Sequence, residues 1–235
     1  MSIKSGSRKL PAYFKKSKID HYILFLYGGG KDKGKEKFKL WQDKLAKEGI
    51  GSLSFDFSGM GDAPGQMKEE SLESRISEAR SAALWLRDEE PSAEFSLYGV
   101  SMGGYVALGL VDKMPEMFSS LILQAPAAYS QNAHNLPFDD SFTEELHEEN
   151  SWKDSYSFKW LKEYEGRVLF VSMEKDNVIP EPILERYKDI LDEKDCEFVT
   201  IPDAPHGIWG DTEEDAKFRE IVYENFCEFL LGKDN

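Results

Sequence analysis

The residues most clearly suited to chemistry lie in the stretch of residues 94–110, EFSLYGVSMGGYVALGL. Residues 95–98 form a short apolar run typical of a buried strand, and residues 104–108 suit a helix. Residues 99–103 between them read G-x-S-x-G, a strand–turn–helix sequence that presents its serine. Such a turn strains the backbone at its centre, and its glycines leave the necessary room. We therefore predict that Ser101 exposes its hydroxyl at the carboxyl edge of a sheet, as a nucleophile.

A serine hydroxyl needs an adjacent base to become a good nucleophile, and the chain has four histidines. His206 follows a strand-like run in a Pro-His-Gly setting, which holds an imidazole in a tight turn. His21 precedes the serine at the start of a strand, whereas His134 and His147 lie in a polar connecting segment. We predict His206 as the base.

An acid must orient the imidazole and stabilise the imidazolium that forms. Glu174 and Asp176 follow the apolar run of residues 167–173, and Asp203 lies close to His206 in the sequence. Asp203 can instead hydrogen-bond its own loop, as aspartates often do. The residues by themselves leave these three carboxylates open.

The oxyanion formed by serine attack needs backbone donors. The N–H of Met102, at the start of the helix, is the first candidate, and helix polarity assists it. Three glycines, residues 28–30, follow the apolar run of residues 21–27 and leave backbone N–H groups uncovered. We predict Gly29 as the second donor.

These stretches resemble the α/β-hydrolase family of serine hydrolases, whose triad runs in the order serine, acid, histidine. The similarity extends over about residues 19–231 and is greatest to the branch of cinnamoyl and feruloyl esterases and monoacylglycerol-lipase-like enzymes. Its further motifs are D-x-V-I-P at residues 176–180, LQAPAA at residues 123–128 and DFSGMGD at residues 56–62. The resemblance implies that Asp176 is the acid of the triad.

Two positions depart from the family pattern. Tyr27 stands where the oxyanion loop usually has a histidine, and Ser58 replaces the arginine of a D-x-R-G-x-G segment. Any ion pair of that arginine is therefore expected to be missing. We interpret Asp56 as the structural anchor of its turn, because it precedes the serine in the chain.

Apolar strand-like runs alternate with helical patterns along the chain, which predicts an α/β fold with a mostly parallel, doubly wound sheet. Residues 1–9 are expected to be loose, and residues 8–16 to form an edge strand or hairpin. The expected strands are residues 21–27, 51–57, 95–98, 119–124, 167–173 and 197–201, and the expected helices are residues 35–48, 71–88, 104–108 onward, 182–191 and 212–231.

The segment of residues 127–165 interrupts this alternation, since it is long, polar, acidic and rich in aromatic residues. We predict that it is a small, mainly helical cap inserted in a single hydrolase domain, residues 1–235. Its aromatic side chains are candidates for substrate binding, namely Phe142, Trp152, Phe158 and Trp160.

Composition and charge limit the partners, the location and the cofactors that we expect for this protein. The 235 residues suit one domain, and a net charge of −15 disfavours nucleic acid and anionic membrane surfaces as partners. We expect neither a membrane span nor an export signal, and a cytoplasmic location in which Cys196 and Cys227 stay reduced. No metal or cofactor is expected, since ligand spacing and a phosphate loop are missing from the sequence.

We therefore predict a serine carboxylesterase that cleaves small or medium acyl or aryl esters through an acyl-enzyme, working as a monomer or homodimer on a small-molecule ester. A thioesterase, a monoacylglycerol lipase or a small peptidase would use the same triad, so these remain alternatives. A catalytically silent binding module is a further alternative from a different class.

Overall fold

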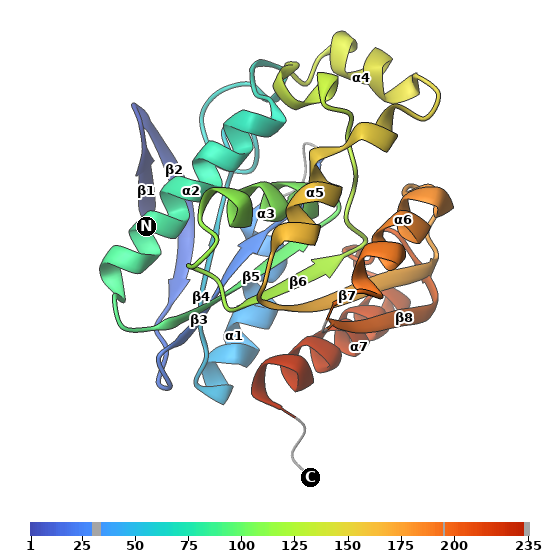
Figure 1. The fold of residues 1–235 in the computed structure, drawn as a ribbon. Helices are drawn as coiled ribbons and strands as arrows, with labels where there is room; N and C mark the ends of the chain where they lie inside the picture. Colours follow the sequence, from blue (N-terminus) through green and yellow to red (C-terminus); the bar gives the residue numbers. More distant parts are fainter. Residues whose placement is uncertain (30–33, 195, 233–235) are drawn as a thin grey trace.

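The computed structural model describes residues 1–29, 34–194 and 196–232. Within them, one sheet of eight strands has the order β1-β2-β4-β3-β5-β6-β7-β8 (Figure 1). The strands are β1 Ser2–Ser5, β2 Arg8–Lys15, β3 His21–Leu26, β4 Gly51–Phe55, β5 Glu94–Val100, β6 Ser120–Gln124, β7 Arg167–Lys175 and β8 Cys196–Pro205.

Strands β3 to β8 run parallel, and β5 lies between β3 and β6 near the middle of the sheet. Every residue of β3, β4 and β6 is buried, as expected for strands covered on both faces. Parallel strands place their carboxyl ends at one edge of the sheet, so the loops after β3, β5, β7 and β8 meet there. The predicted mostly parallel α/β sheet is confirmed.

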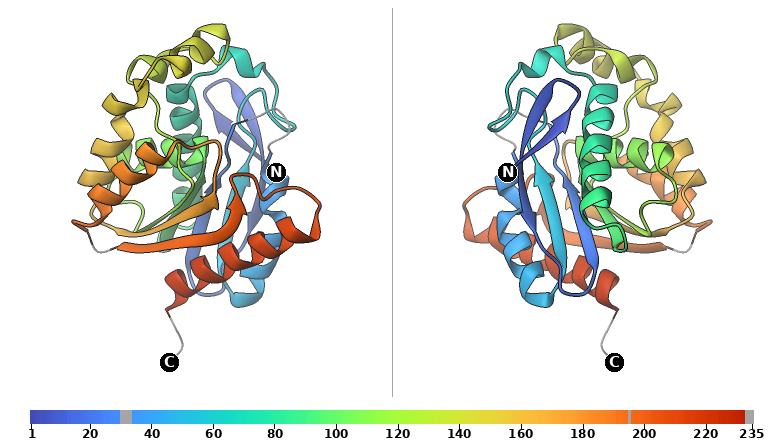
Figure 2. Two further views of the ribbon diagram at one scale, coloured as in Figure 1. Left: turned by 90° about the vertical axis from the view of Figure 1, so that its right-hand side faces the viewer. Right: turned by 90° about the vertical axis from the view of Figure 1, so that its left-hand side faces the viewer.

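Helices cover both faces of the sheet. Figure 2 shows α1 (Lys39–Glu48) and α7 (Glu213–Leu231) on one face, where Trp41 and Phe226 bring their rings to 5.2 Å. The opposite face carries α2 (Leu72–Glu89), α3 (Met102–Lys113) and α6 (Glu181–Leu191). Ser71 caps α2 by accepting a hydrogen bond from the Ser74 N–H.

The expectation that residues 1–9 are loose is wrong. Strand β1 pairs antiparallel with β2, with Ile3 opposite Leu10, and β2 pairs antiparallel with β4. Ile3 and Leu10 are both buried. A short polar strand with one inward apolar residue gives little periodic signal, which explains why the pattern did not indicate it.

The connection between β6 and β7 is mainly helical within residues 125–166. It contains the short helices η3 (Asn132–Asn135) and η4 (Ser151–Asp154) and the α-helices α4 (Asp140–His147) and α5 (Tyr156–Glu163). Figure 1 shows α4 standing away from the sheet, with α5 leading back toward it. Across the described residues, no helix combines the length and apolar character needed to cross a membrane.

Candidate active site

Ser101 occupies the sharp turn between β5 and α3. Its backbone has φ 55° and ψ −122°, a strained conformation for a residue with a side chain. The turn is fixed on both sides, because the Ser101 N–H donates to the Gln124 carbonyl at 3.0 Å and the Ser101 carbonyl accepts from the Ala127 N–H at 3.0 Å. These two hydrogen bonds hold the strained turn in place, with Ser101 at the pocket on the sheet edge.

The glycines that flank the serine are required by close backbone contacts. A β-carbon on Gly103 would lie 2.3 Å from the Leu26 carbonyl oxygen, and one on Gly99 would lie 2.5 Å from the Gly103 carbonyl oxygen. Both contacts are with backbone atoms, which cannot shift without disturbing the strands and the helix. The G-x-S-x-G pattern is thus explained by the packing of α3 against β3 and β5.

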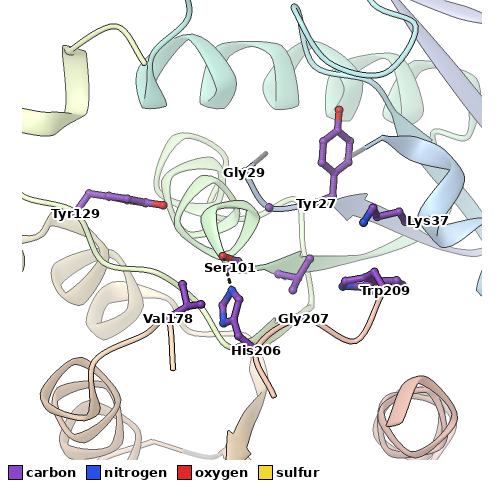
Figure 3. A pocket seen from close by; sticks show the side chains of 11 residues that line it. Tyr27, Gly29, Lys37, Ser101, Tyr129, Val178, His206, Gly207 and Trp209 are labelled. Atoms are coloured by element: carbon purple, nitrogen blue, oxygen red, sulfur yellow. Dashed lines mark hydrogen bonds between the residues drawn. The ribbon is translucent and has the colours of Figure 1, made fainter. Parts of the chain in front are cut away.

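Three loops bring Ser101, His206 and Asp176 together. The His206 Nε2 lies 3.0 Å from the Ser101 Oγ, and its Nδ1 lies 2.8 Å from the Asp176 Oδ2. Figure 3 shows the imidazole between β8 and the serine, directed at the hydroxyl. With the proton on Nδ1, the Nε2 lone pair can accept the serine proton, which is the geometry of a general base.

The Asp176 carboxylate is held by several donors. Its Oδ1 accepts hydrogen bonds from the N–H groups of Val178 at 2.8 Å and Ile179 at 2.9 Å. Burial acts to raise the pKa of Asp176, but the hydrogen bonds from His206, Ile179 and Val178 outweigh it and lower that pKa. Asp176 is therefore an ionised partner for the imidazole.

The two other carboxylates that the sequence offered as candidate acids interact with residues other than His206. Asp203 pairs with Lys175 at 2.5 Å, and its side chain is 68% exposed. Glu174 accepts a hydrogen bond from the Asp203 N–H at 2.8 Å. Both residues thus stabilise their loops, and among the described residues the carboxylate that bonds His206 is that of Asp176.

The glycine loop after β3 passes directly beside the nucleophile. A β-carbon on Gly28 would lie 3.0 Å from the Ser101 Cβ and 3.4 Å from its Oγ, whereas one on Gly29 would meet the end of the Met102 side chain at 3.4 Å. Met102 is the first residue of α3, where backbone N–H groups have no partner within the helix. The predicted donors Met102 and Gly29 therefore both lie at the site, and Gly28, from the same predicted glycine loop, lies beside the nucleophile.

Tyr27 supports this loop from behind. Its side chain is buried and its hydroxyl accepts the Phe57 N–H at 2.9 Å, so it turns away from Ser101 (Figure 3). The tyrosine thus takes a packing position where the family pattern has a histidine.

A cation other than the family arginine pairs with Asp56. The Asp56 carboxylate accepts from the Lys35 Nζ at 2.6 Å, the Lys35 N–H at 2.7 Å and the Asp62 N–H at 2.9 Å. Ser58, at the position of the family arginine, donates instead to Glu78. Lys35 supplies the cation from a different segment, which a comparison of motifs could not reveal.

A pocket of about 280 Å³ opens over the serine. Apart from Ser101, His206 and the loops beside them, its wall is formed by Lys37, Val100, Tyr129, Val178 and Trp209. None of the described residues that line it is acidic.

Sequence comparison identifies the family to which this site belongs. The model of a family described as "Serine aminopeptidase, S33" (Hydrolase_4) matches residues 18–161. The chain belongs to this α/β-hydrolase family. The search of curated proteins gave no significant match.

Solved structures share the hydrolase fold across nearly the whole chain. Est1E from Butyrivibrio proteoclasticus with ferulic acid bound is 18% identical, with a TM-score of 0.74 and 98% of each chain covered. A monoacylglycerol lipase from Paleococcus ferrophilus is 19% identical, with a TM-score of 0.67, covering 92% of this chain and 97% of that one. A malate-bound thermophilic esterase from Thermogutta terrifontis is 17% identical, with a TM-score of 0.70, covering 98% of this chain and 97% of that one.

The four aromatic residues predicted to bind substrate do not line the pocket of this hydrolase. Phe142 packs behind Tyr129 with ring centroids 5.5 Å apart, and Trp160 packs on Tyr105 of α3 at 5.3 Å. Phe158 lies 5.0 Å from Tyr187 of α6, and Trp152 contacts Phe158 at 6.2 Å. Trp160 and Phe158 thus fasten the segment to α3 and α6, whereas Phe142 and Trp152 pack on rings within the segment.

Besides His206 and Tyr27, whose hydroxyl turns away from the serine, the described aromatic residues that line the pocket are Tyr129 and Trp209. Each follows within a few residues of a parallel strand, β6 and β8 respectively. Their place after carboxyl ends of strands was a usable sequence signal, since such loops build the sites of open α/β sheets. Among the described residues, no three His, Cys, Asp or Glu side chains group as a metal site would require.

Proposed function

We propose that this protein is a serine esterase that hydrolyses small or medium acyl or aryl carboxylic esters through an acyl-enzyme. The observation that carries the proposal is the continuous hydrogen-bonded series from the Ser101 Oγ through His206 to the Asp176 carboxylate, at 3.0 and 2.8 Å. It opens into the pocket of about 280 Å³.

In the proposed first step, the Ser101 Oγ bonds to the ester carbonyl carbon while His206 Nε2 takes the hydroxyl proton. The carbonyl oxygen becomes an oxyanion, which in this proposal accepts hydrogen bonds from the Met102 N–H and from an N–H of the glycine loop. The intermediate collapses with loss of the alcohol, which takes the proton from His206. Water then repeats the sequence on the acyl-enzyme and releases the acid and Ser101.

The pocket wall favours esters over peptides with a free amino terminus. A substrate ammonium group needs a carboxylate or several acceptors, and no acidic residue of the described chain faces this pocket, which contains Lys37 instead. The volume also lies just below the range of about 300–1,000 Å³ typical of ligand pockets, which favours short substrates. The ferulic acid in the Est1E structure lends support to aryl acyl groups.

Two measurements test the proposal. A fluorophosphonate probe should label wild-type protein at Ser101 and should not label Ser101→Ala, whose turnover should fall by about 10⁴-fold or more with an unchanged unfolding midpoint. A substrate panel should then show hydrolysis of p-nitrophenyl, cinnamoyl or short alkyl esters ahead of thioesters, long-chain monoacylglycerols and amino-acid p-nitroanilides. Labelling at another residue, or preference for the anilides, would overturn the esterase assignment.

A further inference from the structure

Two hydrogen-bond donors line the pocket, and neither has a hydrogen-bond partner among the described residues. Within the described part of the chain, the Tyr129 hydroxyl and the Trp209 indole N–H make no hydrogen bond, although both residues are half-buried in the pocket wall. Figure 3 shows Tyr129 on one side of the Ser101–His206 pair and Trp209 on the other, each with its polar atom toward the serine.

Neighbouring rings hold both donors in place. Tyr129 packs edge-on against Tyr105 at 5.2 Å, and Phe142 backs it at 5.5 Å. Trp209 packs against Phe38 at 5.3 Å and Trp41 at 5.0 Å. A donor whose direction is set before binding loses little conformational entropy when a ligand arrives.

The Tyr129 donor keeps its proton across the working pH range. Burial raises the pKa of Tyr129, and the nearby Arg75 offsets this only in part. The hydroxyl can therefore donate to a ligand at any pH at which the triad operates.

Filling the pocket strips water from both donors at once. An apolar ligand leaves the two donors unpaired, which is costly, whereas a ligand with oxygens at these points restores both bonds. We propose that Tyr129 and Trp209 are substrate-recognition residues, and that the preferred substrate is a short ester with an acceptor oxygen on each side of the scissile carbonyl. This inference rests on the proposed esterase function and adds the substrate class to it.

Matched esters test the two acceptors separately. Butyl pentanoate has no acceptor beyond the ester, and replacing one chain CH₂ by oxygen gives butyl 3-methoxypropanoate, 2-methoxyethyl pentanoate and the doubly substituted 2-methoxyethyl 3-methoxypropanoate. Values of kcat/KM are divided by the alkaline hydrolysis rates, which removes the intrinsic reactivity of each ester. We expect each oxygen to raise the ratio by about 10-fold, and both together by about 100-fold.

Two variants assign the donors to the two sides. Tyr129→Phe should abolish the gain from one oxygen only, and Trp209→Phe the gain from the other. Tyr156→Phe and Trp85→Phe are matched controls, because Tyr156 stacks on Trp160 at 5.5 Å and Trp85 packs on Phe14 at 5.2 Å, both outside the pocket lining. Both controls should keep both gains.

Lys37 lines the pocket beside Trp209 (Figure 3), so the acceptor on that side is either a neutral oxygen or a carboxylate. An ester with a terminal carboxylate on the side that depends on Trp209 separates these sources. If the carboxylate raises the corrected kcat/KM above that of the ether oxygen, and Lys37→Met removes this increase, the natural acceptor is a carboxylate. If the carboxylate gives no such increase, the natural acceptor is a neutral oxygen. Either result upholds acceptor recognition by Trp209.

The inference fails if wild-type enzyme shows no gain from either oxygen, if the gains survive in both variants, or if both variants lose the same one. Probe labelling of Ser101 and hydrolysis of p-nitrophenyl acetate are measured in the same preparations. If the probe labels Ser101 but the added oxygens do not raise the corrected kcat/KM, the proposed substrate class alone is overturned. If the probe does not label Ser101 in wild-type protein, the esterase function is overturned.

Discussion

Gly28 lies so close to Ser101 that a β-carbon on it would stand 3.0 Å from the serine Cβ and 3.2 Å from the Val100 carbonyl oxygen. Gly28→Ala should therefore displace the loop or the nucleophile. Displacement of a reacting group by about 1 Å can cost about 10²-fold, so we expect kcat to fall by about 10- to 100-fold with the fold retained.

Gly29→Ala is the matched comparison, since its β-carbon would meet only the flexible end of Met102 at 3.4 Å. Its loss of kcat should be smaller. Steady-state kinetics with p-nitrophenyl acetate and thermal unfolding of both variants check this. Equal losses in the two variants would contradict the steric account.

Asp176→Asn should reduce kcat by about 10⁴-fold while preserving the fold, because the imidazole loses its counter-charge and its tautomer control. Asp203→Asn should be nearly neutral, since Asp203 is exposed and pairs with Lys175. Comparison of kcat for the two variants decides between the carboxylates. A severe Asp203→Asn effect with a mild Asp176→Asn effect would reverse the assignment.

The lowered pKa of Asp176 has a consequence for the pH profile. A lowered carboxyl pKa keeps the ionised form present at lower pH than usual, so Asp176 stays charged where imidazoles ordinarily titrate, about pH 5 to 8. The acid limb of kcat/KM should therefore follow one proton, taken up by the base. A plot of log kcat/KM against pH should rise with a slope near one, and a slope near two would show that Asp176 titrates in the same range.

Lys35 and Asp56 form a buried ion pair, with side chains 4% and 1% exposed. Lys35→Met should lower the free energy of unfolding by about 3–5 kcal/mol, because it leaves the Asp56 charge buried without a cation. Lys15→Met is the control, since the Lys15–Asp43 pair is 42% and 38% exposed and such pairs contribute about 0–1 kcal/mol. Urea unfolding measures both, and equal losses would refute the role of burial.

The parts of the fold that follow local patterns were predictable from sequence. Burial of every residue explains the apolar runs of β3 and β6. Close backbone contacts explain the glycines around Ser101, and both features can be seen within a few residues of sequence. Parallel strands, whose carboxyl ends share one edge, predicted that Ser101, His206 and the candidate carboxylates would meet, but the choice of Asp176 among those carboxylates rested on the family motif D-x-V-I-P.

The parts that depend on tertiary packing were not predictable in this way. Lys35 reaches Asp56 across 21 positions of the chain, and no pattern in either segment specifies the other. The aromatic content of the segment of residues 127–165 was evident from sequence, but content alone does not reveal whether a ring faces a pocket or the neighbouring helices. Trp160 proved to pack on Tyr105.

The order of strands along the chain also bears on the timing of folding. Ser101 and His206 are 105 positions apart, and β8, which precedes the histidine, joins the far edge of the sheet. Contacts between such distant segments close late, because the entropy of a long loop must first be overcome. Catalytic competence should therefore emerge as the final event of refolding, so that the return of probe labelling lags behind the return of far-ultraviolet ellipticity. Simultaneous recovery of the two signals would instead indicate that the nucleophile and its base come together in the first collapse of the chain.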